Sequence, residues 1–146
     1  MPSLNTVQGL LMSRDSALIK VMTATMVEAA IATTICTQSE RLAELLAENR
    51  FSVLVLDCDM AGMSETLGGS SLQHEASRFV IAVAGPAGGK RQMARRHVDV
   101  VLTKPVSRPV AKRILRQWAE ARRKEAFGPV ANAALSQDCY AKDAQL

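Results

Sequence analysis

The feature that most constrains this chain is a short apolar run that ends in a carboxylate, within residues 52–62 (SVLVLDCDMAG). Its aliphatic part, residues 53–56, is too short for a helix and suits a strand buried on both faces of a parallel sheet. In open α/β sheets, ligands and chemistry collect just beyond the carboxyl ends of the strands. Asp57 stands at such an end and is therefore a candidate functional residue. The alternative is that Asp57 only caps the turn before Ala61 and Gly62.

Strand-like and helix-like segments alternate along the rest of the chain. Besides the strand at 52–57, short apolar or β-branched runs predict strands at residues 7–12, 31–37, 79–84 and 98–103. Because parallel neighbours need crossover connections, the alternation predicts an α/β protein with a three-layer, doubly wound, five-stranded parallel sheet.

The expected helices have capping residues and apolar stripes. The first follows possible N-cap side chains at residues 13–16 and carries Leu18, Met22, Met26 and Ala29 at four-residue spacing. The second opens with a capping-box spacing from Thr37 to Glu40 and runs to about residue 49. We expect a short helix or a long loop at 62–77 and a basic helix at 90–96. The last helix starts after Ser107, turns Val110, Ile114, Leu115 and Trp118 toward the sheet, and fades near residue 125.

Length and composition limit the class of protein. A chain of 146 residues that is 48% hydrophobic fits one globular domain, which we place at residues 1–126 with a tail or linker at 127–146. No apolar run approaches the roughly 18–20 residues of a membrane span, and the N-terminus lacks signal-peptide features, so we expect a cytoplasmic protein without membrane insertion. The cysteines at 36, 58 and 139 lack metal-ligand spacing, and those at 36 and 58, in apolar strand contexts, are expected to be buried, reduced thiols.

The charge is strongly polarised along the chain. Residues 1–87 carry five Lys/Arg and nine Asp/Glu, whereas residues 88–124 carry twelve Lys/Arg and two Asp/Glu. The net charge of the whole chain is +4. The basic third predicts either a docking surface for a protein or a surface for nucleic acid. Only Trp118 is aromatic there, and no DNA-reading motif is present.

Two motifs now resemble the receiver domain of bacterial two-component response regulators, a CheY-like, flavodoxin-like architecture, over about residues 7–125. Residues 53–62 resemble the family's third strand, where an Asp is followed three residues later by Met, although Ala61 replaces the usual Pro. Residues 100–105 (VVLTKP) resemble the fifth strand with its Lys-Pro pair. The resemblance implies that Asp57 stands at the phosphoacceptor position and that Lys104 would reach an oxygen of the phosphoryl group.

Other parts of the receiver pattern are missing. The two acidic residues that usually hold Mg²⁺ after strand one fall at Ser13 and Arg14, with Asp15 one place later. Asp57 and the backbone carbonyl of Asp59 would remain as ligands, Asp15 would join them if the register slips by one, and Arg14 could instead pair with Asp57. The hydroxyl residue of strand four falls at Ala84, and the aromatic switch residue of strand five at Val101. The resemblance is therefore to a degenerate, or pseudo-, receiver, for which we expect no cofactor, with Mg²⁺ as the alternative.

These departures predict a signalling module with weak or no Mg²⁺-dependent phosphorylation that acts through protein contacts. The resemblance implies a histidine kinase, a downstream effector or a second copy as partner, bound through helix four, strand five and helix five, where we single out Arg95, Arg96 and Arg116. The alternative is nucleic-acid binding by the basic residues of 88–124. An enzyme is not expected, because the chain lacks an acid/base pair, a nucleophile triad or a cofactor loop.

Overall fold

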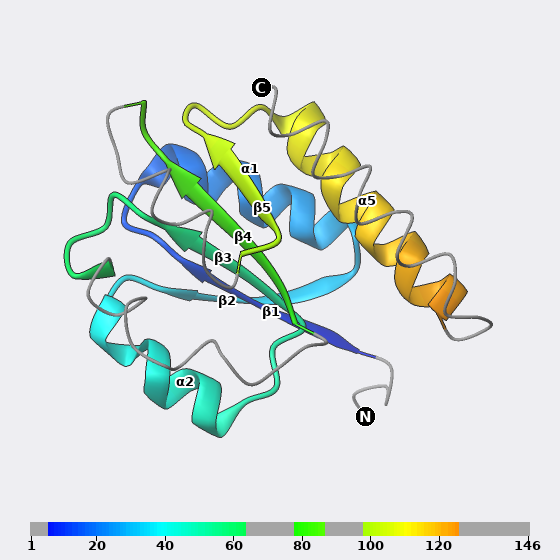
Figure 1. Ribbon diagram of the computed structural model, residues 1–146, viewed down its shortest axis with the longest axis horizontal. Coiled ribbons are helices and arrows are strands. Elements are labelled where there is room, and N and C mark those ends of the chain that lie inside the picture. The colour runs from blue at the N-terminus through cyan, green and yellow to red at the C-terminus, as the bar shows by residue number, and fades with distance from the viewer. Residues whose placement is uncertain (1–5, 64–77, 87–97, 126–146) are drawn as a thin grey trace.

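The computed structural model describes residues 6–63, 78–86 and 98–125, and within these ranges it contains one parallel sheet of five strands in the order β2-β1-β3-β4-β5 (Figure 1). The strands are β1 (Val7–Met12), β2 (Ile31–Cys36), β3 (Val53–Asp57), β4 (Phe79–Ala84) and β5 (Val100–Thr103). The helices are α1 (Ser16–Glu28), the 3-10 turn η1 (Ser39–Arg41), α2 (Leu42–Glu48) and α5 (Arg108–Glu125). The doubly wound α/β fold predicted from the alternation is confirmed.

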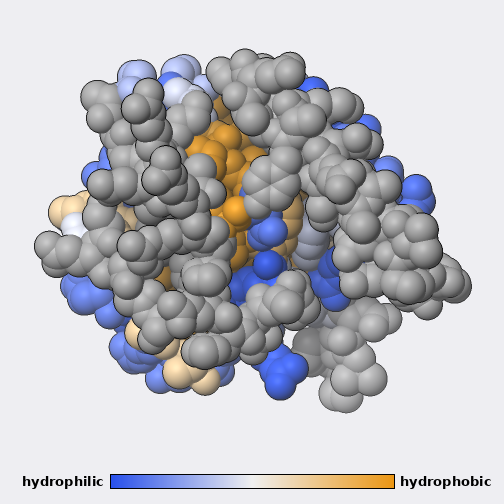
Figure 2. Space-filling view, in the orientation of Figure 1, coloured by the Kyte–Doolittle hydropathy of each residue, from blue (hydrophilic) through white to orange (hydrophobic). Residues whose placement is uncertain are grey.

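The sheet lies between two helical layers, with α1 and α5 on one face and α2 on the other (Figure 1). Because strand side chains alternate between faces, Val53 and Val55 of β3 pack with α1 and α5, whereas Leu54 and Leu56 pack with α2. All five residues of β3 are buried, as expected for a central parallel strand. In the same orientation, apolar residues gather at the centre of the view over the sheet (Figure 2).

The register of the sheet brings three strand ends to one edge. Met12 at the end of β1 lies beside Leu56, and Asp57 lies beside Val83 of β4. Ala84 lies beside Thr103 at the end of β5. The residues that follow β1, β3 and β5 therefore meet at the carboxyl edge of the sheet.

Local signals predicted most element boundaries, but one expected capping motif did not form. Asp15 caps α1, since its Oδ1 accepts from the backbone N–H groups of Ala17 and Leu18 at 3.0 and 3.3 Å. The capping box expected from Thr37 to Glu40 is wrong. The chain forms the 3-10 turn η1 there, and the Ser39 hydroxyl donates to the Ala61 carbonyl at 2.8 Å in the loop after β3. A tertiary hydrogen bond thus determines the local conformation instead of a helix cap.

The last helix begins as predicted. Ser107 Oγ accepts from the backbone N–H of Val110 at 3.3 Å, and Ile114, Leu115 and Trp118 are buried against the sheet. Val110 is only half-buried, and β5 starts at residue 100, two residues later than expected. The expectations for residues 64–77, the helix at 90–96 and the tail at 127–146 lie outside the described residues. In the part of the chain that is described, no helix is long and apolar enough to cross a membrane.

Candidate functional site

Asp57 is a buried carboxylate at the carboxyl end of β3, with 2% of its surface exposed. A carboxylate can be buried without a large cost only if it is paired and hydrogen-bonded. Both of its oxygens lie 3.0 Å from Lys104 Nζ. In addition, the Ser13 hydroxyl donates to Oδ2 at 2.7 Å and the backbone N–H of Asp59 donates to Oδ1 at 3.0 Å. Asp57 is therefore satisfied on both oxygens by groups of the protein itself.

Ser13 follows β1 directly and is fully buried. Its backbone N–H donates to the Cys36 carbonyl at 3.1 Å, which extends the β1–β2 pairing by one residue and fixes its position. Its hydroxyl oxygen also accepts from the backbone N–H of Asp15 at 3.0 Å. The hydroxyl thus links the start of α1 to Asp57.

Lys104 follows β5 and joins three carboxylates. Besides Asp57, its Nζ lies 3.2 Å from Asp15 Oδ2 and 3.3 Å from Asp59 Oδ2. Desolvation acts to lower the pKa of Lys104, but the hydrogen bonds to Asp57 and Asp15 outweigh it and raise this pKa to about 12. In turn, the hydrogen bond from Lys104 lowers the pKa of Asp15. We call Asp15, Asp57, Asp59 and Lys104 the Lys104 cluster, which has one ammonium and three carboxylates.

The alternative in which Arg14 pairs with Asp57 is not what the structure shows, since Asp57 pairs with Lys104. Arg14 is exposed, and within the described residues it makes no ion pair with Asp57. The physical reason is that successive residues of an extended chain point to opposite sides, so Ser13 turns inward and Arg14 outward. Arg14 instead borders a shallow pocket with Gln38 and Glu40. Asp15 joins the cluster without the register slip that we considered, because it caps α1 beside Lys104.

Comparison with solved structures identifies the fold. A Francisella response regulator receiver domain superposes with a TM-score of 0.65 at 19% identity, over 79% of this chain and 98% of that one. The signal receiver domain of a putative Luxo repressor protein from Vibrio parahaemolyticus superposes with a TM-score of 0.68 at 12% identity, over 84% of this chain and 96% of that one. The signal receiver domain of a DNA-binding response regulator (merR) from Colwellia psychrerythraea 34H superposes with a TM-score of 0.65 at 19% identity, over 78% of this chain and 98% of that one. This chain has the receiver-domain fold.

Sequence comparisons do not extend this result, since no family model and no curated protein matches the chain. In the receiver-type fold of this protein, Ala84 is fully buried at the end of β4 and brings no hydroxyl to the carboxyl edge. Val101 in β5 is partly buried and packs against the core on the α2 side. Both positions thus hold apolar packing residues.

Asp59 has a role that the sequence did not indicate. Its Oδ2 accepts from the backbone N–H of Gly85 at 2.8 Å while it also pairs with Lys104. It therefore joins the loop after β3 to the loop after β4. The hydroxyl bond from Ser13 was also missed, because we considered that position only as a lost metal ligand.

Cys58, between the two carboxylates, is partly buried, while Cys36 is buried, and both are free thiols. Desolvation, followed by the negative charges of Asp57 and Asp59, raises the pKa of Cys58 to about 12. At neutral pH this thiol stays protonated, so it is a poor nucleophile. Cys139 lies outside the described residues.

The interaction residues singled out from the sequence are only partly described. Arg116 is exposed on α5, whereas Arg95 and Arg96 lie outside the described residues. Trp118 is buried, as the helical spacing predicted, and stacks on Phe79 with ring centroids 6.1 Å apart. Its accessible face is covered by the Arg122 guanidinium, 5.2 Å from the ring centroid.

Proposed function

We propose that this chain is a receiver-type signalling module of the response-regulator kind, in which Asp57 occupies the phosphoacceptor position but is little used for Mg²⁺-dependent phosphorylation. The observation that carries the proposal is the direct pairing of Asp57 with Lys104 and Ser13. A carboxylate attacks phosphorus through a free oxygen lone pair, and both oxygens of Asp57 already accept hydrogen bonds in a nearly inaccessible place.

The donor set at this edge does not fit a divalent ion. Mg²⁺ is bound by carboxylate oxygens in a strict octahedral arrangement. Here the oxygens of Asp15, Asp57 and Asp59 lie 3.0–3.3 Å from one ammonium, which takes the place that a cation would need. Lys104 thus supplies a permanent positive charge where Mg²⁺ would supply a removable one.

Without a phosphoryl signal, the output has to come from contacts with other proteins. α5 presents Arg116 and other exposed basic side chains to solvent, which suits an acidic partner or a second copy of the chain. Reversing Arg95, Arg96 and Arg116 to Glu should abolish partner capture or self-association, measured by sedimentation, while the circular dichroism spectrum stays unchanged. Unaltered association in the triple variant would contradict the proposal that this surface binds the partner.

The chemistry at Asp57 has its own test. Acetyl phosphate with Mg²⁺ should leave the intact mass of the wild-type protein unchanged, because Asp57 is occupied. The double variant Ser13→Asp/Arg14→Asp restores the two acidic positions and should gain Mg²⁺ binding by calorimetry. A stoichiometric mass increase of one phosphoryl group in the wild type, lost in Asp57→Asn, would overturn the proposal.

Nucleic-acid binding is the second candidate, because the basic side chains of α5 are exposed along much of the helix. Trp118 argues against it, since Phe79 and Arg122 cover its ring and leave no platform for a base. Retention of random duplex DNA, with an affinity that falls steeply between low and near-physiological salt, would favour this candidate over a protein partner.

A further inference from the structure

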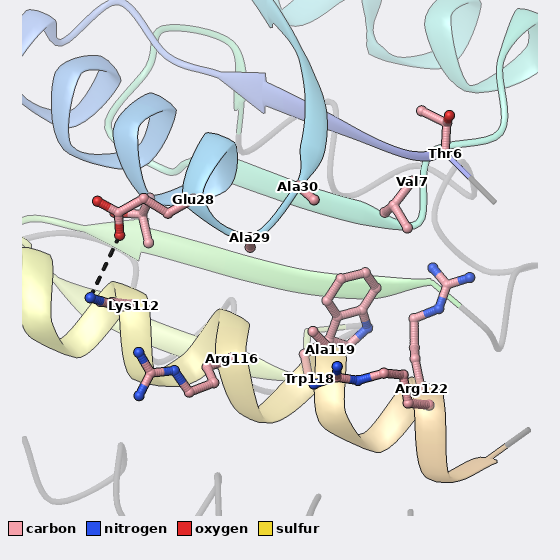
Figure 3. A pocket seen from close by; sticks show the side chains of 12 residues that line it. Thr6, Val7, Glu28, Ala29, Ala30, Lys112, Arg116, Trp118, Ala119 and Arg122 are labelled. Carbon is pink, nitrogen blue, oxygen red and sulfur yellow. Dashed lines mark ion pairs between the residues drawn. The ribbon is translucent and has the colours of Figure 1, made fainter. Parts of the chain in front are cut away.

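A cavity of about 720 Å³ lies between α5 and the opposite edge of the sheet from Asp57. Figure 3 shows that its walls come from α5 on one side and from the end of α1 and the start of β1 on the other. Its size falls within the roughly 300–1,000 Å³ typical of small-molecule sites. Because Val7 and Ser13 stand at opposite ends of β1, the cavity is separate from the Lys104 cluster.

The wall formed by α5 is cationic. Lys112, Arg116, Arg122 and Arg123 line it, and all four are exposed. Glu28 is the one acidic residue of the lining, and its carboxylate already pairs with Arg108 and, at 3.8 Å, with Lys112. The wall therefore keeps an excess of positive charge that the protein does not neutralise within the described residues.

The facing wall is small, and apart from Glu28 at the end of α1, which is already paired, it is uncharged. Val7, Ala29 and Ala30 form it, and Ala30 has a φ of 62°, which turns the chain sharply from α1 into β2. Thr25 also borders the cavity, but its hydroxyl donates to the Val21 carbonyl at 2.7 Å. This wall thus offers packing surface with little polar competition. A ligand that fits both walls has an anionic part and a less polar, flat part.

Trp118 also lines the cavity. It rises from α5 toward the facing wall in Figure 3, with Arg122 beside it. The Arg122 guanidinium lies over the indole, so an anion that draws this guanidinium away changes the surroundings of the ring. Trp118 is the single tryptophan of the chain and therefore reports on this cavity alone.

From these observations we infer that the cavity binds a nucleoside diphosphate or triphosphate, with the phosphates on the arginines of α5 and the base or ribose on the uncharged wall. Guanidinium groups bind phosphate oxygens in pairs of hydrogen bonds, and several of them suit a polyphosphate better than a single phosphate. The cavity is also much larger than an inorganic phosphate needs. The inference does not rest on any role of Asp57.

The test follows the indole N–H resonance of Trp118 while ADP, GDP, adenosine or inorganic pyrophosphate is added to the full chain. ADP or GDP should give a saturable shift, adenosine should give none, and pyrophosphate should bind more weakly than the nucleotides. Arg122→Gln/Arg123→Gln should weaken nucleotide binding by at least about tenfold, because each lost charged hydrogen bond has an effect of that order. Lys20→Gln, an exposed charge on α1 outside the lining, should bind like the wild type.

Other outcomes would overturn the inference. Absence of a saturable shift with both nucleotides would show that the cavity is no nucleotide site. Pyrophosphate binding as tight as that of ADP would reduce it to a general anion site. Binding of duplex DNA without binding of ADP would show a nucleic-acid surface instead. Equal loss of affinity in Lys20→Gln and in the double arginine variant would show long-range charge attraction rather than a built site.

Discussion

Replacing Lys104 by methionine should lower the free energy of unfolding by about 3–5 kcal/mol, because it leaves a buried charge without its partner. Methionine keeps a flexible chain of similar length but removes the ammonium. Asp57, whose side chain is only 3% exposed, then loses a contact of 3.0 Å on each oxygen. Asp15 and Asp59 are left facing Asp57 with no cation between them, and their mutual repulsion adds to the loss.

Asp57→Asn is the matched variant, and its effect should stay within about 1 kcal/mol. The amide has nearly the shape of the carboxylate, so the packing at the end of β3 is kept. Its oxygen can still accept from the Asp59 N–H, and its nitrogen can donate to Ser13 Oγ. Lys104 retains Asp15 and Asp59, and the cluster loses one of its excess negative charges.

Urea unfolding followed by circular dichroism measures both variants and the double variant Asp57→Asn/Lys104→Met. The double variant should be more stable than Lys104→Met, because the buried charge that needs compensation is gone. Equal losses of stability in Lys104→Met and Asp57→Asn would show that removing the carboxylate charge destabilises the fold as much as removing the ammonium. A neutral Lys104→Met would refute the reasoning, since it would mean that the buried carboxylate needs no cation.

Three further predictions concern single positions. Ser13→Ala should lower stability by about 1.5–3 kcal/mol, since it removes a hydroxyl donor from the buried Asp57 carboxylate, and urea unfolding checks it. Lys104 holds the pKa of Asp15 below its usual 3.8, so this stabilisation is complete above that pH and is lost as the pH falls further. The stability difference between wild type and Asp15→Asn, which still caps α1, should therefore shrink in acid, and a constant difference would contradict the ion pair. Gly9→Ala should cost about 1–3 kcal/mol on thermal unfolding, because its new methyl group would collide with side chains of α1 and β2.

Patterns within short segments predicted the fold well. Phe79–Ala84 is a strand with the predicted bounds, and α5 starts after Ser107 as its capping residue and Pro109 indicated. Such features depend on neighbouring residues, which the sequence displays directly. The strand order could not be derived in this way, because it depends on which distant segments pair.

The site was harder to predict for the same reason. The resemblance placed Asp57 and Lys104 at the ends of the third and fifth strands, and the structure brings their side chains into contact across the end of β4. Which of Ser13 and Arg14 faces Asp57 depends on the side to which each residue points after β1; Ser13 faces it, whereas Arg14, which we considered as an alternative partner, is exposed. Asp59 contacts Gly85 through two loops that no local pattern connects.

The most direct test of the central claim is an amide NMR titration with Mg²⁺ and beryllofluoride, a mimic of the phosphoryl group. The resonances of Ser13, Asp57, Asp59 and Gly85 surround the Lys104 cluster and would report on any ligand there. If Lys104 and Ser13 keep Asp57 occupied, these resonances should not shift with increasing beryllofluoride. Saturable shifts that require Mg²⁺ would contradict the account and show a working phosphoacceptor.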